Sequence, residues 1–183
     1  MFTDNQIKNF VDGGLISVMP APVQKQFQPA SLDWRIGAVE IFDKDTICLN
    51  QREYWKMFSE TAEENEDMAD FVKYIDGYVD SLGGNIKYLE RDEPFIIEPG
   101  QQAMVYSLEQ FRIPDGLAVF SELRSSNGRR GLSPVDGFVQ DLSYEGRIQM
   151  SVVNKNPNSL RLYGGDRFAQ LFFELKNQCE FDM

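Results

Sequence analysis

Histidine is absent from the 183 residues of the chain. Histidine is the commonest general base near neutral pH, and it completes the Ser/His/Asp and Cys/His catalytic triads. Its absence excludes these triads, His-ligated zinc centres and the zinc-dependent nucleobase deaminases, whose signature contains a histidine. Any hydrolytic chemistry must therefore use carboxylates, arginines, backbone N–H groups or a metal that arrives with its ligand.

Cysteine and long apolar runs are also scarce. The two cysteines, Cys48 and Cys179, have no metal-type spacing and do not make a disulfide framework, so we expect two reduced thiols. No apolar run approaches the roughly 20 residues that span a bilayer. The polar first residues are unlike a signal peptide. These features predict a cytoplasmic protein with no membrane partner.

Positive charge is in the minority. The chain has 18 Lys and Arg against 29 Asp and Glu, a net charge of −11. Nonspecific binding of DNA or RNA needs clustered Lys and Arg to neutralise phosphates. The acidic balance therefore argues against a nucleic-acid partner, but a small anionic ligand in one local basic pocket is compatible with it.

Short strand-like runs separated by turn signals fill most of the chain. Residues 31–37 alternate, with Asp33 and Arg35 on the side opposite the apolar residues, which predicts a half-buried strand. Further strands are expected within residues 39–49, 86–89, 95–97, 103–108, 117–123, 138–139, 147–154, 160–162 and 168–174. So many short strands predict a mainly β fold, either a sandwich or a barrel.

Two helices are expected beside the strands. Residues 3–6 read as a capping box that opens a short N-terminal helix, and Gly13 and Gly14 end it. Residues 59–82 are acidic at first and then carry apolar side chains at three- and four-residue spacing, which predicts an inserted amphipathic helix with a solvated acidic face. We expect the whole chain, residues 1–183, to form one domain that includes this insertion.

The most distinctive turn spans residues 122–132, after one of the expected strands. Its Ser, Asn and Gly residues end the strand and expose backbone N–H groups, and Arg129 and Arg130 add positive charge beside these donors. In so acidic a chain this turn indicates an anion site, most plausibly for phosphate. A polar hairpin with solvated arginines is the alternative.

Five segments, in this order, resemble the dCTP deaminase/dUTPase superfamily, and most closely its dCTP deaminase branch. The segments are residues 27–37 (FQPASLDWRIG), 92–100 (DEPFIIEPG), 124–132 (RSSNGRRGL), 141–146 (DLSYEG) and 165–172 (GDRFAQLF). The resemblance runs nearly from end to end. It implies a distorted jelly-roll β fold and a homotrimer whose nucleotide sites lie between neighbouring subunits.

The resemblance also implies roles for single residues. The triphosphate would be held by four residues of the basic turn, namely Ser125, Ser126, Gly128 and Arg129. Mg²⁺ would arrive bridging the phosphates. Asp141 would meet the deoxyribose 3′-hydroxyl and, in the dUTPase branch, help to activate water. Tyr144 would pack under the sugar, and Gln170 would have a lesser nucleotide-facing or structural role. From the residues alone, Asp141 is better interpreted as a turn former that bonds its own backbone.

The sequence departs from the deaminase branch at one catalytic position. That branch carries a glutamate five residues after the glycine of D-x-x-[YW]-x-G, where it shuttles protons as water attacks C4 of cytosine. The matching residue here is Ser151, whose hydroxyl cannot serve alone as a general base near neutral pH. Asp136, in the hairpin expected to line the base pocket, is the candidate replacement, because a carboxylate there can also accept from cytosine N4.

Three functions follow from these observations. The first is deamination of dCTP to dUTP and ammonia, with Asp136 in place of the glutamate. The second is a dUTPase-like diphosphatase that releases pyrophosphate from dUTP or dCTP, with Asp141 positioning water and Arg129 stabilising phosphate charge. The third is nucleotide binding without catalysis in a regulatory protein. Similarity over the whole chain puts deamination first.

Overall fold

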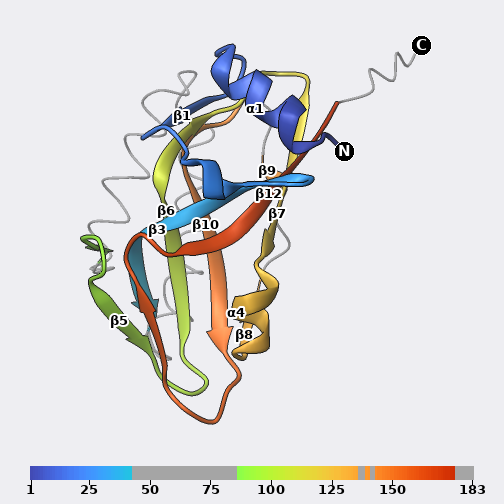
Figure 1. Cartoon of the computed structure of the whole chain (residues 1–183). Coiled ribbons are helices and arrows are strands. Elements are labelled where there is room, and N and C mark those ends of the chain that lie inside the picture. Colours follow the sequence, from blue (N-terminus) through green and yellow to red (C-terminus); the bar gives the residue numbers. More distant parts are fainter. Residues whose placement is uncertain (43–85, 136–138, 141–142, 176–183) are drawn as a thin grey trace, which may run out of the picture.

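The computed structural model describes residues 1–42, 86–135, 139–140 and 143–175 (Figure 1). The expected helix at 59–82 and the part of the expected strand at 39–49 beyond Phe42 lie outside these ranges. The same holds for both cysteines and for two of the candidate site residues, Asp136 and Asp141.

Most of the described chain is antiparallel β structure. The strands are β1 (Ser17–Met19), β2 (Phe27–Gln28), β3 (Ser31–Phe42), β4 (Lys87–Tyr88), β5 (Pro94–Ile97), β6 (Gln102–Arg112), β7 (Leu117–Leu123), β8 (Leu132–Pro134), β9 (Val139–Gln140), β10 (Glu145–Asn154), β11 (Leu160–Tyr163) and β12 (Arg167–Leu175). The main sheet has the order β8-β10-β6-β3-β12-β7-β9, while β1 pairs with β6, β2 and β4 pair with β3, and β5 pairs with β11. The strands curl into a nearly closed barrel (Figure 1), which confirms the predicted mainly β class.

Three short helices accompany the strands in the described ranges: α1 (Asp4–Asp12), the 3-10 turn η1 (Gln24–Gln26) and α4 (Ser125–Arg129). The predicted capping box of α1 is confirmed. Gln6 N–H donates to Thr3 Oγ1, and Thr3 N–H donates to Gln6 Oε1 at 3.0 Å. Within the described residues no helix is long and apolar enough to cross a bilayer.

Apolar side chains from β3, β6, β10 and β12 fill the barrel interior. Trp34 is fully buried on β3, and its ring centroid lies 5.1 Å from that of Phe168 on β12. The Trp34 indole N–H donates to Ser121 Oγ on β7 at 3.4 Å, so its polar atom is also satisfied. The core therefore joins β3 and β12 to β7, the strand that α4 follows in the chain.

The prediction that β3 is a half-buried strand was wrong. Asp33, expected on the side away from the apolar residues, is fully buried, and almost every residue from Ser31 to Glu40 is buried as well. The physical reason is that β3 lies between β6 and β12 in the sheet and that arginines compensate the charge of Asp33. Alternation predicts which residues share a face, but it does not predict what covers each face.

Candidate functional site

The basic turn after β7 forms the short helix α4 rather than a hairpin. The N–H groups of Asn127 and Gly128 donate to the carbonyl of Arg124 at 2.9 and 3.1 Å. The first N–H groups of a helix have no acceptor within it, so those of Ser125 and Ser126 remain free to bind another group. The sequence predicted the donors and the charge of this segment but not its helical conformation.

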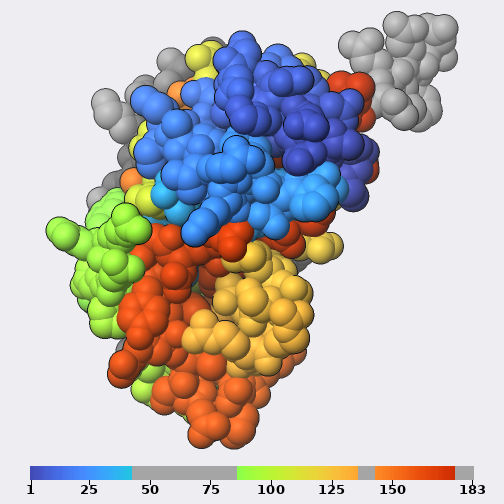
Figure 2. Space-filling view, viewed as in Figure 1, coloured from blue at the N-terminus to red at the C-terminus, as the bar shows by residue number. Residues whose placement is uncertain are grey.

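A single carbonyl of β12 anchors α4 to the barrel. The oxygen of Phe168 accepts from Arg124 N–H at 3.2 Å and from the side-chain amide of Asn127 at 2.9 Å. Asn127 is buried by this contact, whereas Ser125 and Ser126 are exposed. Figure 2 shows this segment, in yellow-orange, standing on the surface beside the orange-red C-terminal strands.

A buried ion cluster lies at the start of α4. The Nε of Arg124 is 3.2 Å from Asp33 Oδ2, and the Nη1 of Arg167 donates to the same oxygen at 3.1 Å. Burial raises the pKa of Asp33, and the two guanidiniums oppose this rise. The cluster contains one carboxylate and two partly exposed guanidiniums, so these three groups together carry a net positive charge beside the helix. Sequence reasoning assigned no role to these three residues, although each lies within a quoted motif.

The two arginines at the end of α4 differ in their surroundings. Arg130 donates to the backbone carbonyl of Arg161. Arg129 is exposed and makes no ion pair or hydrogen bond within the described part of the chain. Arg129 is therefore the cation of the predicted pair that is available to an anion.

The two glycines of the motif, Gly131 and Gly128, lie in positions with different steric restrictions. Gly131 has a φ of +102°, and a Cβ built on it would lie 2.8 Å from the Cβ of Asn156. Both features require glycine at this position. Gly128 has no such restriction, since a Cβ there would meet no atom within 4 Å. An open backbone at Gly128 leaves room for a ligand to approach it closely.

Gln170 lies on β12 beside the ion cluster. Its Cα partners are Asp33 on β3 and Glu122 on β7, and its amide donates to Ser31 Oγ at 3.1 Å. The structure thus brings Gln170 together with the strands that support α4. Its two predicted roles, nucleotide-facing or structural, remain predictions.

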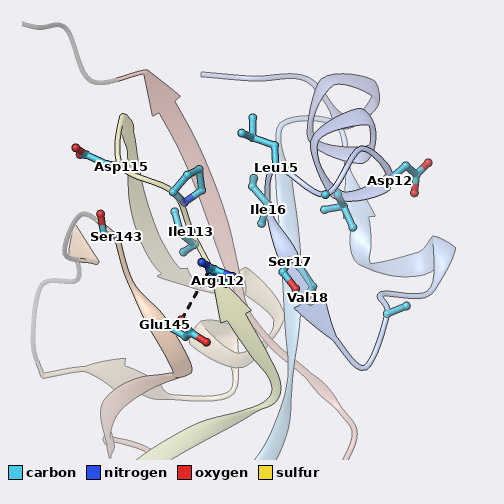
Figure 3. Close-up of a pocket in the computed structure, with 14 residues that line it drawn as sticks. Asp12, Leu15, Ile16, Ser17, Val18, Arg112, Ile113, Asp115, Ser143 and Glu145 are labelled. Carbon is cyan, nitrogen blue, oxygen red and sulfur yellow. Dashed lines mark ion pairs between the residues drawn. The ribbon is translucent and has the colours of Figure 1, made fainter. Parts of the chain in front are cut away.

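Tyr144 lies at the other end of the molecule. It is partly buried against the core, its hydroxyl donates to the carbonyl of Arg147, and burial raises its pKa to about 12. Its neighbours Ser143 and Glu145 line a pocket of about 920 Å³ between the end of α1, β1 and the end of β6 (Figure 3). An exposed ion pair joins the neighbouring strands β6 and β10 on one wall of this pocket, with Arg112 Nε 3.8 Å from Glu145 Oε2 (Figure 3). The pocket lies beside α1 and β1, at the end of the molecule away from α4 (Figure 1).

Strand β10 separates the two groups of predicted site residues. Tyr144 immediately precedes β10, whereas β8, which follows α4, pairs with the far end of β10 through Asn154 and Leu132. Ten residues at about 3.3 Å each amount to roughly 30 Å. Within one chain, the residues of α4 and Tyr144 are therefore too far apart to hold the phosphates and the sugar of one nucleotide.

Ser151 lies on β10 beside Val135, the residue before Asp136. The N–H of Val135 donates to the carbonyl of Ser151 at 3.0 Å, and the Ser151 hydroxyl accepts from Gln102 at 2.7 Å. The catalytic position of the deaminase branch and the hairpin expected to line the base pocket are thus adjacent in the described structure.

Comparison with known proteins fits this fold and motif set. A "dCTP deaminase, dUMP-forming" from Methanosphaera stadtmanae is 30% identical over 176 residues, which cover 95% of this chain and 78% of the relative. A "dCTP deaminase" from Mannheimia succiniciproducens is 26% identical over 174 residues, 94% of this chain and 81% of the relative. The solved 2′-deoxycytidine 5′-triphosphate deaminase from Agrobacterium tumefaciens superposes with a TM-score of 0.63 at 15% identity. That match covers 96% of this chain but only 47% of the other.

The nearly closed antiparallel barrel of this chain, with its short N-terminal helix, has a dUTPase-like fold. The chain belongs to the dCTP deaminase-like family, whose model matches residues 1–175.

Proposed function

We propose that this chain binds a pyrimidine deoxynucleoside triphosphate and deaminates dCTP to dUTP and ammonia. The observation that carries the proposal is α4. It presents the exposed hydroxyls of Ser125 and Ser126 and the guanidinium of Arg129, which has no partner among the described residues, beside a cluster of two arginines and one aspartate. Charge-assisted donors in a fixed arrangement suit a triphosphate. Membership of the dCTP deaminase-like family supports cytosine as the base.

The sugar and the base are assigned to the other predicted residues. We propose that Asp141 binds the deoxyribose 3′-hydroxyl and that Tyr144 packs under the sugar. Asp136 is the sequence-based candidate for the proton-transferring group near C4. Because Tyr144 lies a strand length from α4, the proposal includes a neighbouring copy of the chain that completes each site, as in the homotrimer implied by the resemblance.

We propose that Mg²⁺ enters bound to the triphosphate. Within the described residues no group of three or more His, Cys, Asp or Glu side chains could hold a metal ion, so the residues of α4 fit a nucleotide-borne cation better than a resident one. Bound in this way, Mg²⁺ would neutralise part of the phosphate charge. The residues of α4 would orient the phosphates.

A second candidate function is pyrophosphate release. Several relatives are named "dUMP-forming", among them those from Methanosphaera stadtmanae and Aquifex aeolicus, each 30% identical to this chain. Formation of dUMP from dCTP requires loss of both ammonia and pyrophosphate. In this version Asp141 would position water for attack on the phosphate and Arg129 would stabilise the charge that develops.

One assay separates the three functions. The purified chain is incubated with dCTP and with dUTP in the presence of Mg²⁺, and ammonia and pyrophosphate are measured separately. Ammonia from dCTP without pyrophosphate is the expected result. Pyrophosphate from either nucleotide supports the diphosphatase. Neither product, together with a raised Tm in the presence of dCTP, supports a binding protein without catalysis and contradicts the proposal.

A further inference from the structure

A row of residues crosses three strands on the face of the sheet opposite the core. The register places Glu40 of β3 opposite Met104 of β6, and Met104 opposite Ser151 of β10. Residues opposite one another in antiparallel strands share a face. The adjacent row, which includes Val39 and Val105, faces the core. Glu40 and Ser151 therefore lie on one face with a single strand between them.

Two diagonal hydrogen bonds surround Met104 on this face. The hydroxyl of Tyr106 donates to Glu40 Oε2 at 3.1 Å, and the amide of Gln102 donates to the hydroxyl of Ser151 at 2.7 Å. Glu40 and Ser151 are buried, whereas Met104 and Gln102 are only partly buried. An apolar side chain is thus flanked by a carboxyl group on one side and by a hydroxyl and an amide on the other.

Glu40 differs from the other buried carboxylates of the described chain. Asp33 has two arginines, and Glu109 accepts from Arg35 Nε at 2.6 Å. Glu40 has the phenol of Tyr106 and no cation among the described residues. Burying a carboxylate without a cation costs stability, and burial raises the pKa of Glu40. A group that costs stability and has a shifted pKa is a candidate for chemistry.

The position of this face relative to the hairpin matches the pyrimidine end of the proposed site. Val135, the residue before Asp136, is bonded to the Ser151 backbone, so the hairpin expected to line the base pocket begins beside the row. Neighbouring strands lie about 4.8 Å apart, which places the Cα atoms of Glu40 and Ser151 about 10 Å from each other. A pyrimidine ring stacked on the Met104 thioether would lie between their side chains.

We propose that Glu40, rather than the sequence-based candidate Asp136, is the carboxylate that transfers protons during deamination of dCTP, in place of the glutamate that Ser151 replaces. This inference rests on the proposed function. Tyr106 is a positioning residue that holds the carboxyl group toward the middle of the sheet, and the pair of Gln102 and Ser151 bounds the opposite edge of the ring.

The reaction balances with Glu40 unchanged at the end. The carboxylate takes a proton from water as the water oxygen bonds to C4, and the π electrons of the C4–N3 bond move to N3. Glu40 delivers that proton to N3. It then takes the proton of the new 4-hydroxyl and gives it to the 4-amino nitrogen. The bond between C4 and the 4-amino nitrogen breaks, ammonia leaves with the electron pair of that bond, and C4 becomes the carbonyl carbon of dUTP.

The test measures ammonia release from dCTP by the full chain and by its Glu40→Gln variant, which keeps the shape of the side chain. We expect kcat to fall about 100-fold or more, the scale of general acid–base catalysis. KM should change by no more than about threefold, and the Tm without nucleotide should not fall. Glu174→Gln, a partly exposed carboxylate on β12, is the matched control and should keep its kcat. Ser151→Glu added to Glu40→Gln should restore turnover.

The outcomes separate this inference from the proposed function. Ammonia release that persists in Glu40→Gln, or that is lost only in Asp136→Asn, overturns the role of Glu40 and leaves deamination intact. A wild-type chain that binds dCTP but releases no ammonia overturns both. Loss of dCTP binding in Glu40→Gln also contradicts a catalytic role.

Tyr106→Phe gives an independent readout. The hydrogen bond from Tyr106 lowers the pKa of Glu40, so its removal should move the acidic limb of the kcat profile to higher pH. Among the described residues Tyr106 is the titratable group bonded to Glu40. Burial raises the pKa of Tyr106, and the nearby charge of Glu40 and then Tyr88 on β4 raise it further. An unmoved limb contradicts a role for Glu40 as the base.

Discussion

Asp33 and Glu40 are both buried carboxylates on β3, but they are compensated differently. Asp33 forms ion pairs with two guanidiniums, and its Oδ1 has no hydrogen-bond partner among the described residues. Because Arg124 directly precedes α4, this pairing also fixes the start of the proposed phosphate site. Asp33 therefore contributes both to folding stability and to the position of the helix.

Asp33→Ala should lower the free energy of unfolding by about 3 kcal/mol, because it leaves two partly buried guanidiniums without their acceptor. Urea denaturation at neutral pH measures this change. The control is Asp166→Ala, which removes an exposed carboxylate next to Arg167 in sequence. Equal stability of the two variants would show that the cluster contributes nothing to stability.

Single residues of the site were only partly predictable. Local composition around residue 125 was sufficient to indicate hydroxyls, charge and free N–H groups. The cluster of Asp33, Arg124 and Arg167 was not predicted, because its members come from distant parts of the chain and meet only when β3 and β12 pair. Glu40 was missed for the same reason, since its relation to Ser151 depends on the register of three strands.

Helix α4 is a weak helix by composition. Ser, Asn and Gly are poor helix formers, and five residues are too few for a stable isolated helix. The anchors of Arg124 and Asn127 on β12 stabilise it instead. Sequence patterns therefore predicted most strands close to their observed bounds, including 117–123, but described α4 as a turn.

Gly128, within α4, and Gly131, just after it, offer a matched pair of substitutions. Gly131→Ala should destabilise the chain by about 1–3 kcal/mol, because it combines a positive φ with a contact of 2.8 Å to Asn156. Gly128→Ala meets no neighbour and should be neutral or stabilising by up to about 1 kcal/mol.

Thermal unfolding of both variants, with and without dCTP, completes this test. If phosphate approaches the backbone of α4, Gly128→Ala should retain its fold but show a smaller rise in Tm on addition of dCTP. An unchanged response to dCTP would mean that the nucleotide does not contact the helix at Gly128.

The barrel order was not predictable from strand spacing. Alternation and turn signals give the number and kind of elements, but the pairing of β3 with β12 and β6 depends on contacts between distant segments. The separation of α4 from Tyr144 by the length of β10 could not be predicted from the sequence either. It leads to the one prediction that concerns several copies of the chain.

Two variants that each have low activity should recover activity when they are co-expressed. Arg129→Ala should weaken triphosphate binding by about 1.5–3 kcal/mol. Asp141→Asn alters the motif that contains Tyr144. If each site combines α4 of one copy with this motif of a neighbour, random mixing gives an intact pair at about a quarter of the interfaces. Ammonia release by the mixed assembly, compared with each variant alone, measures this. No recovery would place the whole site in one chain.

The attachment of α4 to the Phe168 carbonyl has a consequence for mutational analysis of the proposed anion site. The acceptor is a main-chain oxygen, so no side-chain replacement at position 168 can delete it. Only displacement of the strand itself can remove this acceptor. Anion binding and the integrity of the barrel wall therefore depend on the same strand. A mutational scan for lost ligand affinity would report this attachment at its side-chain donor, Asn127, but not at position 168.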